Sequence, residues 1–73
     1  MDFYFCRHAK RQMKWRRISE EDVKTVVSSP DDVQATSKSR KNAMKAMGNR
    51  LLKVTYTEEQ EKIVVITAID KKQ

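Results

Sequence analysis

Hydrophobic residues near the start of the chain recur at the spacing of a helix. Phe5, Ala9 and Met13 are four residues apart, so a helix over residues 7–16 would place them on one side. Five lysines and arginines fall on the opposite side: Arg7, Lys10, Arg11, Lys14 and Arg17. The pattern predicts a short helix with one buried face and one strongly basic face.

A second helix is predicted to start directly after a tight turn at residues 16–18. Ser19 can accept a backbone N–H as the N-cap, and Asp22 sits three residues later, where a capping box places its acid. Val23 opens an apolar face that Val26 and Val27 continue. Pro30 marks the end of the helix, because a residue before proline avoids helical geometry.

In the second half of the chain, apolar and polar residues alternate with the two-residue period of β-strands. Residues 50–57 alternate apolar and polar side chains, which predicts a half-buried strand that turns Leu52, Val54 and Tyr56 inward. Residues 62–69 are apolar on both sides, and the charged residues 58–61 between the two segments have hairpin length. A further strand is expected around Val33 and Ala35.

The local pattern does not decide the secondary structure of two segments. Residues 2–6 fit an edge strand or an extended lead-in. Residues 39–48 fit a helix capped by Ser39 and ended by Gly48, or an irregular strand. The expected fold is therefore α+β, with two short N-terminal helices packed on a small three- or four-stranded antiparallel sheet. Residues 1–73 are expected to form a single domain, since a chain of 73 residues builds one thin core.

Charge divides the chain into blocks. Residues 1–17 carry +5 and residues 35–53 carry +6, whereas residues 18–34 carry −4. If the fold joins the two basic blocks, the positive surface would suit phosphate backbones or an acidic protein. RNA or another nucleic acid and an acidic protein are accordingly the expected partners.

Several classes are disfavoured by composition. One histidine and one cysteine without an acid cluster do not make a zinc site, and one glycine cannot build a phosphate-cradling loop. No cofactor or metal is expected. There is no apolar run near the length of a membrane span and no basic segment of a secretory signal. The lone Cys6 fits a reducing cytoplasm, where the protein is expected to reside.

Ordered pieces along nearly the whole chain resemble a small prokaryotic family, domain of unknown function 4258. The pieces are His8-Ala9-x-x-Gln12-Met13-x-x-Arg16-x-Ile18-Ser19, Pro30, Gly48-x-Arg50-Leu51-x-x-Val54 and Val65-Ile66-Thr67-Ala68. The family often has arginine at the position of Gln12 and glycine at that of Arg17.

That family is similar to the barnase–EndoU–colicin–RelE superfamily, and the resemblance implies two N-terminal helices against a four-stranded antiparallel meander. It would make residues 39–48 a strand. The superfamily consists mostly of metal-independent ribonucleases, many of them toxins paired with antitoxins. The resemblance therefore implies a RelE-like or colicin-like domain that acts on RNA.

Metal-free RNA cleavage needs a base for the ribose 2′-OH, an acid for the leaving oxygen and cations for the phosphorane. His8 is the candidate acid–base group and Arg16 the candidate catalytic cation. The candidate nucleic-acid contacts are Arg11, Arg40, Lys45 and Tyr56, and Trp15 is a second candidate for base stacking.

Each candidate has a structural alternative. His8 could buttress the helix, Arg16 could pair with an acid or cap the helix end, and the aromatic rings could pack at the edge of the core. We expect either a ribonuclease toxin or a non-catalytic module that binds nucleic acid or protein, and the sequence leaves both open.

Overall fold

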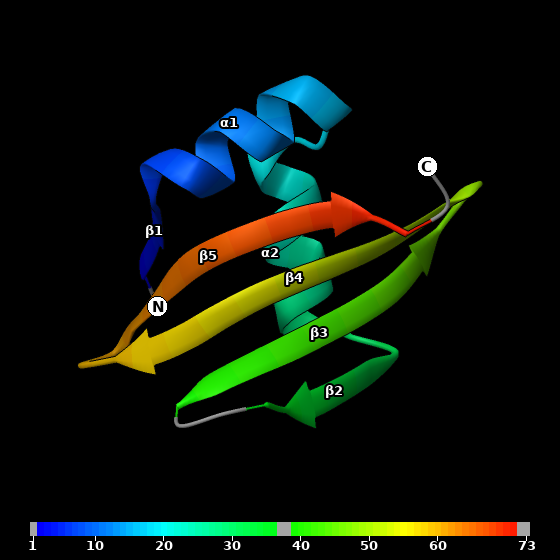
Figure 1. Cartoon of the computed structure of the whole chain (residues 1–73). Helices are drawn as coiled ribbons and strands as arrows, with labels where there is room; N and C mark the ends of the chain where they lie inside the picture. The colour runs from blue at the N-terminus through cyan, green and yellow to red at the C-terminus, as the bar shows by residue number, and fades with distance from the viewer. Residues whose placement is uncertain (1, 37–38, 72–73) are drawn as a thin grey trace.

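The computed structural model describes residues 2–36 and 39–71. Figure 1 shows two helices and a twisted sheet. The elements in chain order are β1 (Asp2–Phe5), α1 (Arg7–Arg16), α2 (Glu20–Ser28), β2 (Asp32–Ala35), β3 (Arg40–Met47), β4 (Arg50–Glu59) and β5 (Lys62–Asp70).

The strand order is β1-β5-β4-β3-β2. The strands β2 to β5 pair antiparallel with one another, whereas β1 pairs parallel to the first half of β5, with Phe5 opposite Val65. The predicted α+β class with two N-terminal helices is confirmed. The predicted three or four antiparallel strands were too few, because residues 2–5 join the sheet and make it five-stranded and mixed.

Residues 39–48, left open between helix and strand, contain β3. This strand pairs with β4 along its whole length, from Arg40 opposite Thr57 to Met47 opposite Arg50. Gly48 does not end a helix; it has a φ of +64° and starts the two-residue turn between β3 and β4. Glycine suits that place because a turn of this length needs a positive φ that other residues resist.

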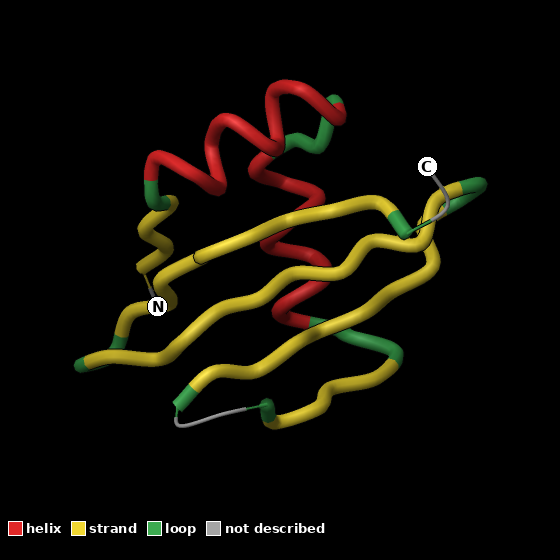
Figure 2. Tube along the Cα trace, in the orientation of Figure 1, coloured by secondary structure: helices red, strands yellow, loops and turns green. Residues whose placement is uncertain are grey.

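Both helices contribute to a core on one side of the sheet. Ala9 and Met13 of α1 and Val23 and Val26 of α2 are buried. They pack in one cluster with inward residues of the sheet: Ala43, Leu52, Val54, Tyr56, Ile63, Val65 and Ala68. In Figure 2, α2 crosses behind the strands and α1 runs along the β5 edge. The opposite side of the sheet faces the reader with neither helix over it.

The turn between the helices follows the sequence closely. Arg17 adopts a φ of 56°, and its N–H donates to Lys14 O at 3.4 Å while Ile18 N donates to Met13 O at 2.8 Å. This pair of bonds closes α1 and points Ile18 into the core. The Ser19–Asp22 capping box then starts α2, as predicted, with Asp22 N donating to Ser19 Oγ at 3.0 Å.

The neighbour of β5 changes halfway along the strand. Tyr56 lies opposite Val65 and Thr55 opposite Thr67, so Ile66 is an extra, bulged residue. At the same point Cys6 N donates to Val65 O at 3.2 Å and Cys6 Sγ donates to Ile66 O at 3.4 Å. Beyond the bulge α1, rather than β1, lies beside β5, and this fixes α1 along the sheet edge.

Candidate nucleic-acid interface

The basic face predicted for the first helix is present and turned to solvent. Five cationic side chains of α1 and its C-terminal end are exposed: Arg7, Lys10, Arg11, Lys14 and Arg17. In the described part of the chain, none of these five forms an ion pair. The helix contains no acidic residue. Its outer face therefore carries positive charge that the fold does not neutralise.

The two aromatic candidates for base stacking differ in exposure, and the structure favours Trp15 over Tyr56. Tyr56, a candidate base contact, is only 5% exposed and packs in the core, where a nucleotide base cannot reach its ring. Trp15 is 81% exposed on α1. A tryptophan ring left so open on a cationic face is available for stacking on a base.

His8 is exposed in the first turn of α1. Arg11 follows it by three residues and Trp15 by seven, so the three side chains share one stripe of the helix. The stripe does not support a buttress role for His8, because an exposed ring packs little against the sheet. It places the sole imidazole of the chain beside a free guanidinium and an open aromatic ring.

Arg16 has a different environment. Its carbonyl accepts a hydrogen bond from Arg50 Nη2 at 3.0 Å, and its own side chain is half-buried. Arg16 Nε and Gln12 Oε1 are buried without a hydrogen-bond partner among the described residues. A donor and an acceptor thus lie unsatisfied one turn apart on α1, between the buried and the basic faces.

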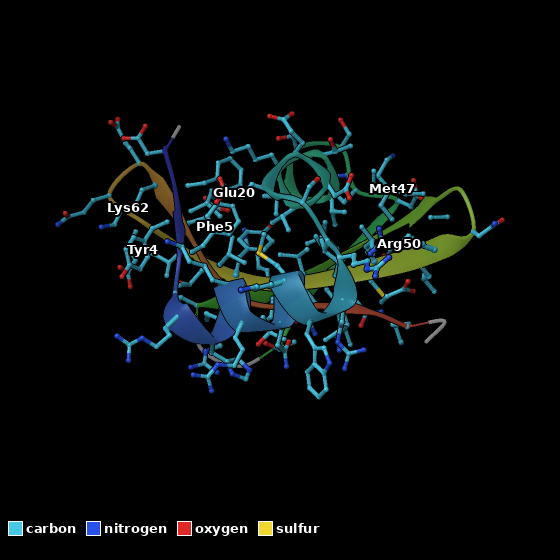
Figure 3. The ribbon with its side chains drawn as sticks, turned by 90° about the horizontal axis from the view of Figure 1, so that it is seen from above. Tyr4, Phe5, Glu20, Met47, Arg50 and Lys62 are labelled. Atoms are coloured by element: carbon cyan, nitrogen blue, oxygen red, sulfur yellow. The ribbon has the colours of Figure 1, made fainter. Side chains whose placement is uncertain are left out.

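Three cations of the second basic block pair with acids within the fold. Figure 3 shows Arg50 beside the C-terminal end of α1, where it reaches Asp70 at 3.2 Å and Asp22 at 3.8 Å. Lys41 pairs with Glu58 at 3.3 Å and Lys45 pairs with Asp31 at 3.5 Å. Lys45, a candidate nucleic-acid contact, is therefore engaged with an acid on the helix-facing side of β3.

Asp31 is held by more than Lys45. Its Oδ2 accepts a hydrogen bond from Ala46 N at 3.0 Å, and this bond, with a smaller contribution from Lys45, lowers the pKa of the Asp31 carboxyl. Asp31 N in turn donates to Met44 O at 2.8 Å. The residue fastens the start of β2 to the end of β3.

Arg40 and Lys53 are the cations of the second block that lie on the side of the sheet away from the helices. The register places Arg40 opposite Thr57, and Lys53 between Met44 and Ile69. Neither forms an ion pair within the described ranges 2–36 and 39–71. The alternation of residues 50–57 already marked Lys53 as outward, although it was not among the predicted contacts.

His8 and the segment from Arg40 to Lys45 are not brought into one cleft. α1 lies along β5, whereas β3 is separated from β5 by β4. The predicted residues therefore divide between two surfaces. His8 and Arg11 belong to α1, Arg40 belongs to the uncovered side of the sheet, and Lys45 faces the helix side.

Across residues 2–36 and 39–71, the structure contains no group of three His, Cys, Asp or Glu side chains placed to hold a metal ion. None of the helices described here has the length and apolar character needed to cross a membrane.

A family model described as "Domain of unknown function (DUF4258)" matches residues 5–70. No curated protein matches the chain. No solved structure matches it either.

Proposed function

The chain belongs to the family described as domain of unknown function (DUF4258), which matches it over residues 5–70. We propose that this family member binds RNA. The binding surface is the α1 interface, which we define as Trp15 and five cations: Arg7, Lys10, Arg11, Lys14 and Arg17. One observation carries the proposal: an acid-free helix exposes unpaired cations around an open tryptophan ring. Phosphates and bases are the ligand groups that these two kinds of side chain bind best.

Kinship to RelE-like and colicin-like ribonucleases is part of the proposal. Its support is the order of elements, because two N-terminal helices precede a four-stranded antiparallel meander formed by β2 to β5. That arrangement is the one which the resemblance implied. A toxin of this kind would also bind an acidic antitoxin-like protein, and the α1 interface offers such a partner its positive charge.

Metal-independent cleavage of RNA is a second candidate, favoured by the exposure of His8 within the stripe. As a base, His8 would take the proton of a ribose 2′-hydroxyl, and the 2′ oxygen would attack phosphorus. The bond to the 5′ oxygen would break and water would protonate the leaving oxygen, which yields a 2′,3′-cyclic phosphate and a 5′-hydroxyl end. Arg11, one turn from His8 on the same stripe, is the candidate cation for the phosphorane, whereas Arg16 lies about 12 Å from His8 along the helix axis.

Trp15 provides a direct binding assay, because it is the only tryptophan in the chain. Titration with a mixed-sequence RNA should quench Trp15 fluorescence, and the affinity should fall steeply with salt. Exchange of both Arg11 and Lys14 for Gln should reduce the slope of log K against log salt by about 1.4, or 0.7 for each phosphate contact. Lys41→Gln, which removes a cation paired with Glu58, is the matched control and should change the slope little.

Two results would count against RNA binding at α1. The control removes one charge and the α1 variant two, so a loss of binding free energy in the control of about half that in the α1 variant would show that net charge alone matters. Tighter binding of poly-glutamate than of RNA would favour an acidic protein as the partner.

Cleavage is tested separately on free RNA in EDTA and on translating ribosomes in a buffer that contains the Mg²⁺ they need. We expect a cyclic phosphate product with the wild-type chain and none with His8→Ala. Because His8 is exposed, the variant should keep its thermal midpoint. Binding without cleavage in both assays would reject the catalytic candidate and leave the binding function intact.

A further inference from the structure

The side of the sheet that no helix covers has an ordered set of side chains, which we call the open sheet face. Its central row consists of hydroxyl and amide groups: Asn42 lies opposite Thr55, and Thr55 lies opposite Thr67. The Thr55 hydroxyl donates to Asn42 Oδ1 at 2.7 Å. Among the described residues the amide N–H2 of Asn42 has no further partner, so the row retains donors for a ligand.

Positive charge borders this row on both sides. Arg40 lies beyond the row toward one end of β3, and Lys53 lies beyond it toward the other end of the sheet. Of the residues that β3 and β5 turn to this face, none is acidic. The acids on this side lie away from the row: Glu59 at the far end of β4, Asp2 opposite Lys62 on β1, and Asp32 opposite Met44 on β2. In a bound nucleic-acid strand, the two cations could contact successive phosphates, and the neutral donors between the cations could contact the sugars and bases.

An exposed ring completes the open sheet face. Tyr4 lies beside Val64, is 57% exposed, and has the Lys62 ammonium 5.8 Å from its ring centroid. Figure 3 shows Tyr4 and Lys62 together at the end of the molecule away from Arg50. Tyr4 belongs to the strand that leads into α1, and α1 runs beside β5. The open sheet face and the α1 interface therefore adjoin along β5.

We propose that the open sheet face is the second half of the binding site and takes an unpaired RNA strand that continues from the α1 interface. This inference rests on the proposed RNA-binding function and adds to it the class of RNA. Arg40 and Lys53 contact phosphates, and Tyr4 stacks on a base. The row of Asn42, Thr55 and Thr67 hydrogen-bonds ribose hydroxyls and base edges.

The chemistry favours a single RNA strand over the other nucleic acids. Stacking on Tyr4 and Trp15 requires bases that are not already paired and stacked in a duplex. The hydroxyl and amide groups of the central row distinguish RNA from DNA, because only RNA offers a 2′-hydroxyl that both donates and accepts. A DNA strand of the same sequence should use the cations and rings but lose the contacts of the row.

The test compares neighbouring residues on opposite sides of one strand. Arg40 faces the open side, whereas Lys41 pairs with Glu58 on the helix side. Arg40→Gln and Lys53→Gln should each weaken binding of a 12-nucleotide unpaired RNA about threefold to tenfold and reduce the salt slope by about 0.7. Lys41→Gln is the matched control and should keep the wild-type affinity. Thermal midpoints of all three variants establish that they fold.

The central row is tested by discrimination between nucleic acids. Thr55→Val removes the hydroxyl and keeps the shape, so it should lower the ratio of RNA to DNA affinity at least threefold without changing affinity for DNA. Thr25→Val, on the exposed side of α2, is the hydroxyl control and should leave the ratio unchanged. Duplex RNA should bind the wild-type chain more weakly than the single strand.

The outcomes separate this inference from the function beneath it. If variants of Arg11 and Lys14 lose RNA while those of Arg40, Lys53 and Thr55 do not, the α1 function holds and the open sheet face is rejected. If none of the variants weakens binding, both fail. A concentration-dependent dimer that Lys53→Gln disrupts, without any effect on RNA, would assign the open sheet face to a second copy of the chain and overturn the inference.

Discussion

Arg50 Nε donates to Asp70 Oδ2 at 3.2 Å, and Asp70 is only 4% exposed. The same guanidinium donates to the carbonyl that ends α1 and lies 3.8 Å from Asp22 in the first turn of α2. Asp70 Oδ1 also accepts Leu51 N at 3.3 Å. The Arg50 side chain thus connects both helices to the strands β4 and β5.

Arg50→Ala should destabilise the chain by about 2–3 kcal/mol. The substitution removes Arg50 from the buried Asp70 carboxylate, and loss of one partner of a buried pair is costly. The figure is below that of a fully buried pair because Arg50 is itself half-exposed. Urea denaturation measures the change, and Lys41→Ala, which breaks an exposed pair, should cost under about 1 kcal/mol. Equal costs for the two variants would deny Arg50 this joining role.

Arg17→Gly should stabilise the chain by about 0.5–1 kcal/mol. Arg17 ends α1 at a φ of 56°, in the left-handed region where a Cβ atom is unfavourable and glycine is not. The denaturation midpoint in urea should rise. Gly48→Ala is the reverse experiment at a φ of +64°, where an added Cβ meets no atom within 4 Å, so only backbone strain should lower the midpoint. Changes of the same sign in both variants would contradict the argument.

Gln12→Met should also raise stability, by about 1 kcal/mol. Gln12 Oε1 is buried without a partner in the described chain, and an unsatisfied acceptor costs about 1–3 kcal/mol. Methionine keeps the length and flexibility of the side chain and removes the polar atom. Calorimetry should show a higher melting temperature for Gln12→Met, while Gln34→Met on the exposed strand β2 should change it little. A fall in stability for Gln12→Met would contradict the argument that the buried Gln12 amide oxygen is unsatisfied.

The link between β2 and β3 should weaken in acid. The Ala46 N–H bond and Lys45 lower the pKa of Asp31 in the folded chain, so its contribution to stability is present at neutral pH. That contribution is lost as the pH falls through the lowered pKa, because protonation then favours the unfolded chain. In carbon NMR the Asp31 carboxyl should titrate at a pKa below that of an ordinary aspartate side chain. The stability difference between wild type and Asp31→Asn should shrink as the pH falls through that lowered pKa.

Elements were predictable where local signals agreed. The Ser19–Asp22 box and the alternation of residues 50–57 identified α2 and β4, and the same alternation placed Tyr56 among inward residues. The aromatic ring predicts a base contact at Tyr56, whereas the strand period predicts a buried ring, and Tyr56 is buried. The alternation of the strand was therefore the better guide to the position of Tyr56.

Other features depend on contacts between distant segments. Trp15 is open because α1 meets the sheet along β5, a relation that no window of sequence contains. Lys41, Lys45 and Arg50 look like free cations in the sequence, yet Glu58, Asp31 and Asp70 neutralise them across the fold. Residues 39–48 resolved to a strand only through pairing with β4.

The parallel pairing of β1 with β5 also sets the order in which the chain can fold. Phe3 lies opposite Ile63, 60 residues later in the chain, so the first strand has no lateral partner until the last one has been synthesised. Contacts of such long separation close large loops and slow folding. The helices and the hairpins β2–β3 and β3–β4 can form from local contacts, whereas docking of β1 waits for the last strand. On the ribosome this domain would complete its core only after β5 has left the exit tunnel, and until then Phe3 and Phe5 have no sheet edge to cover.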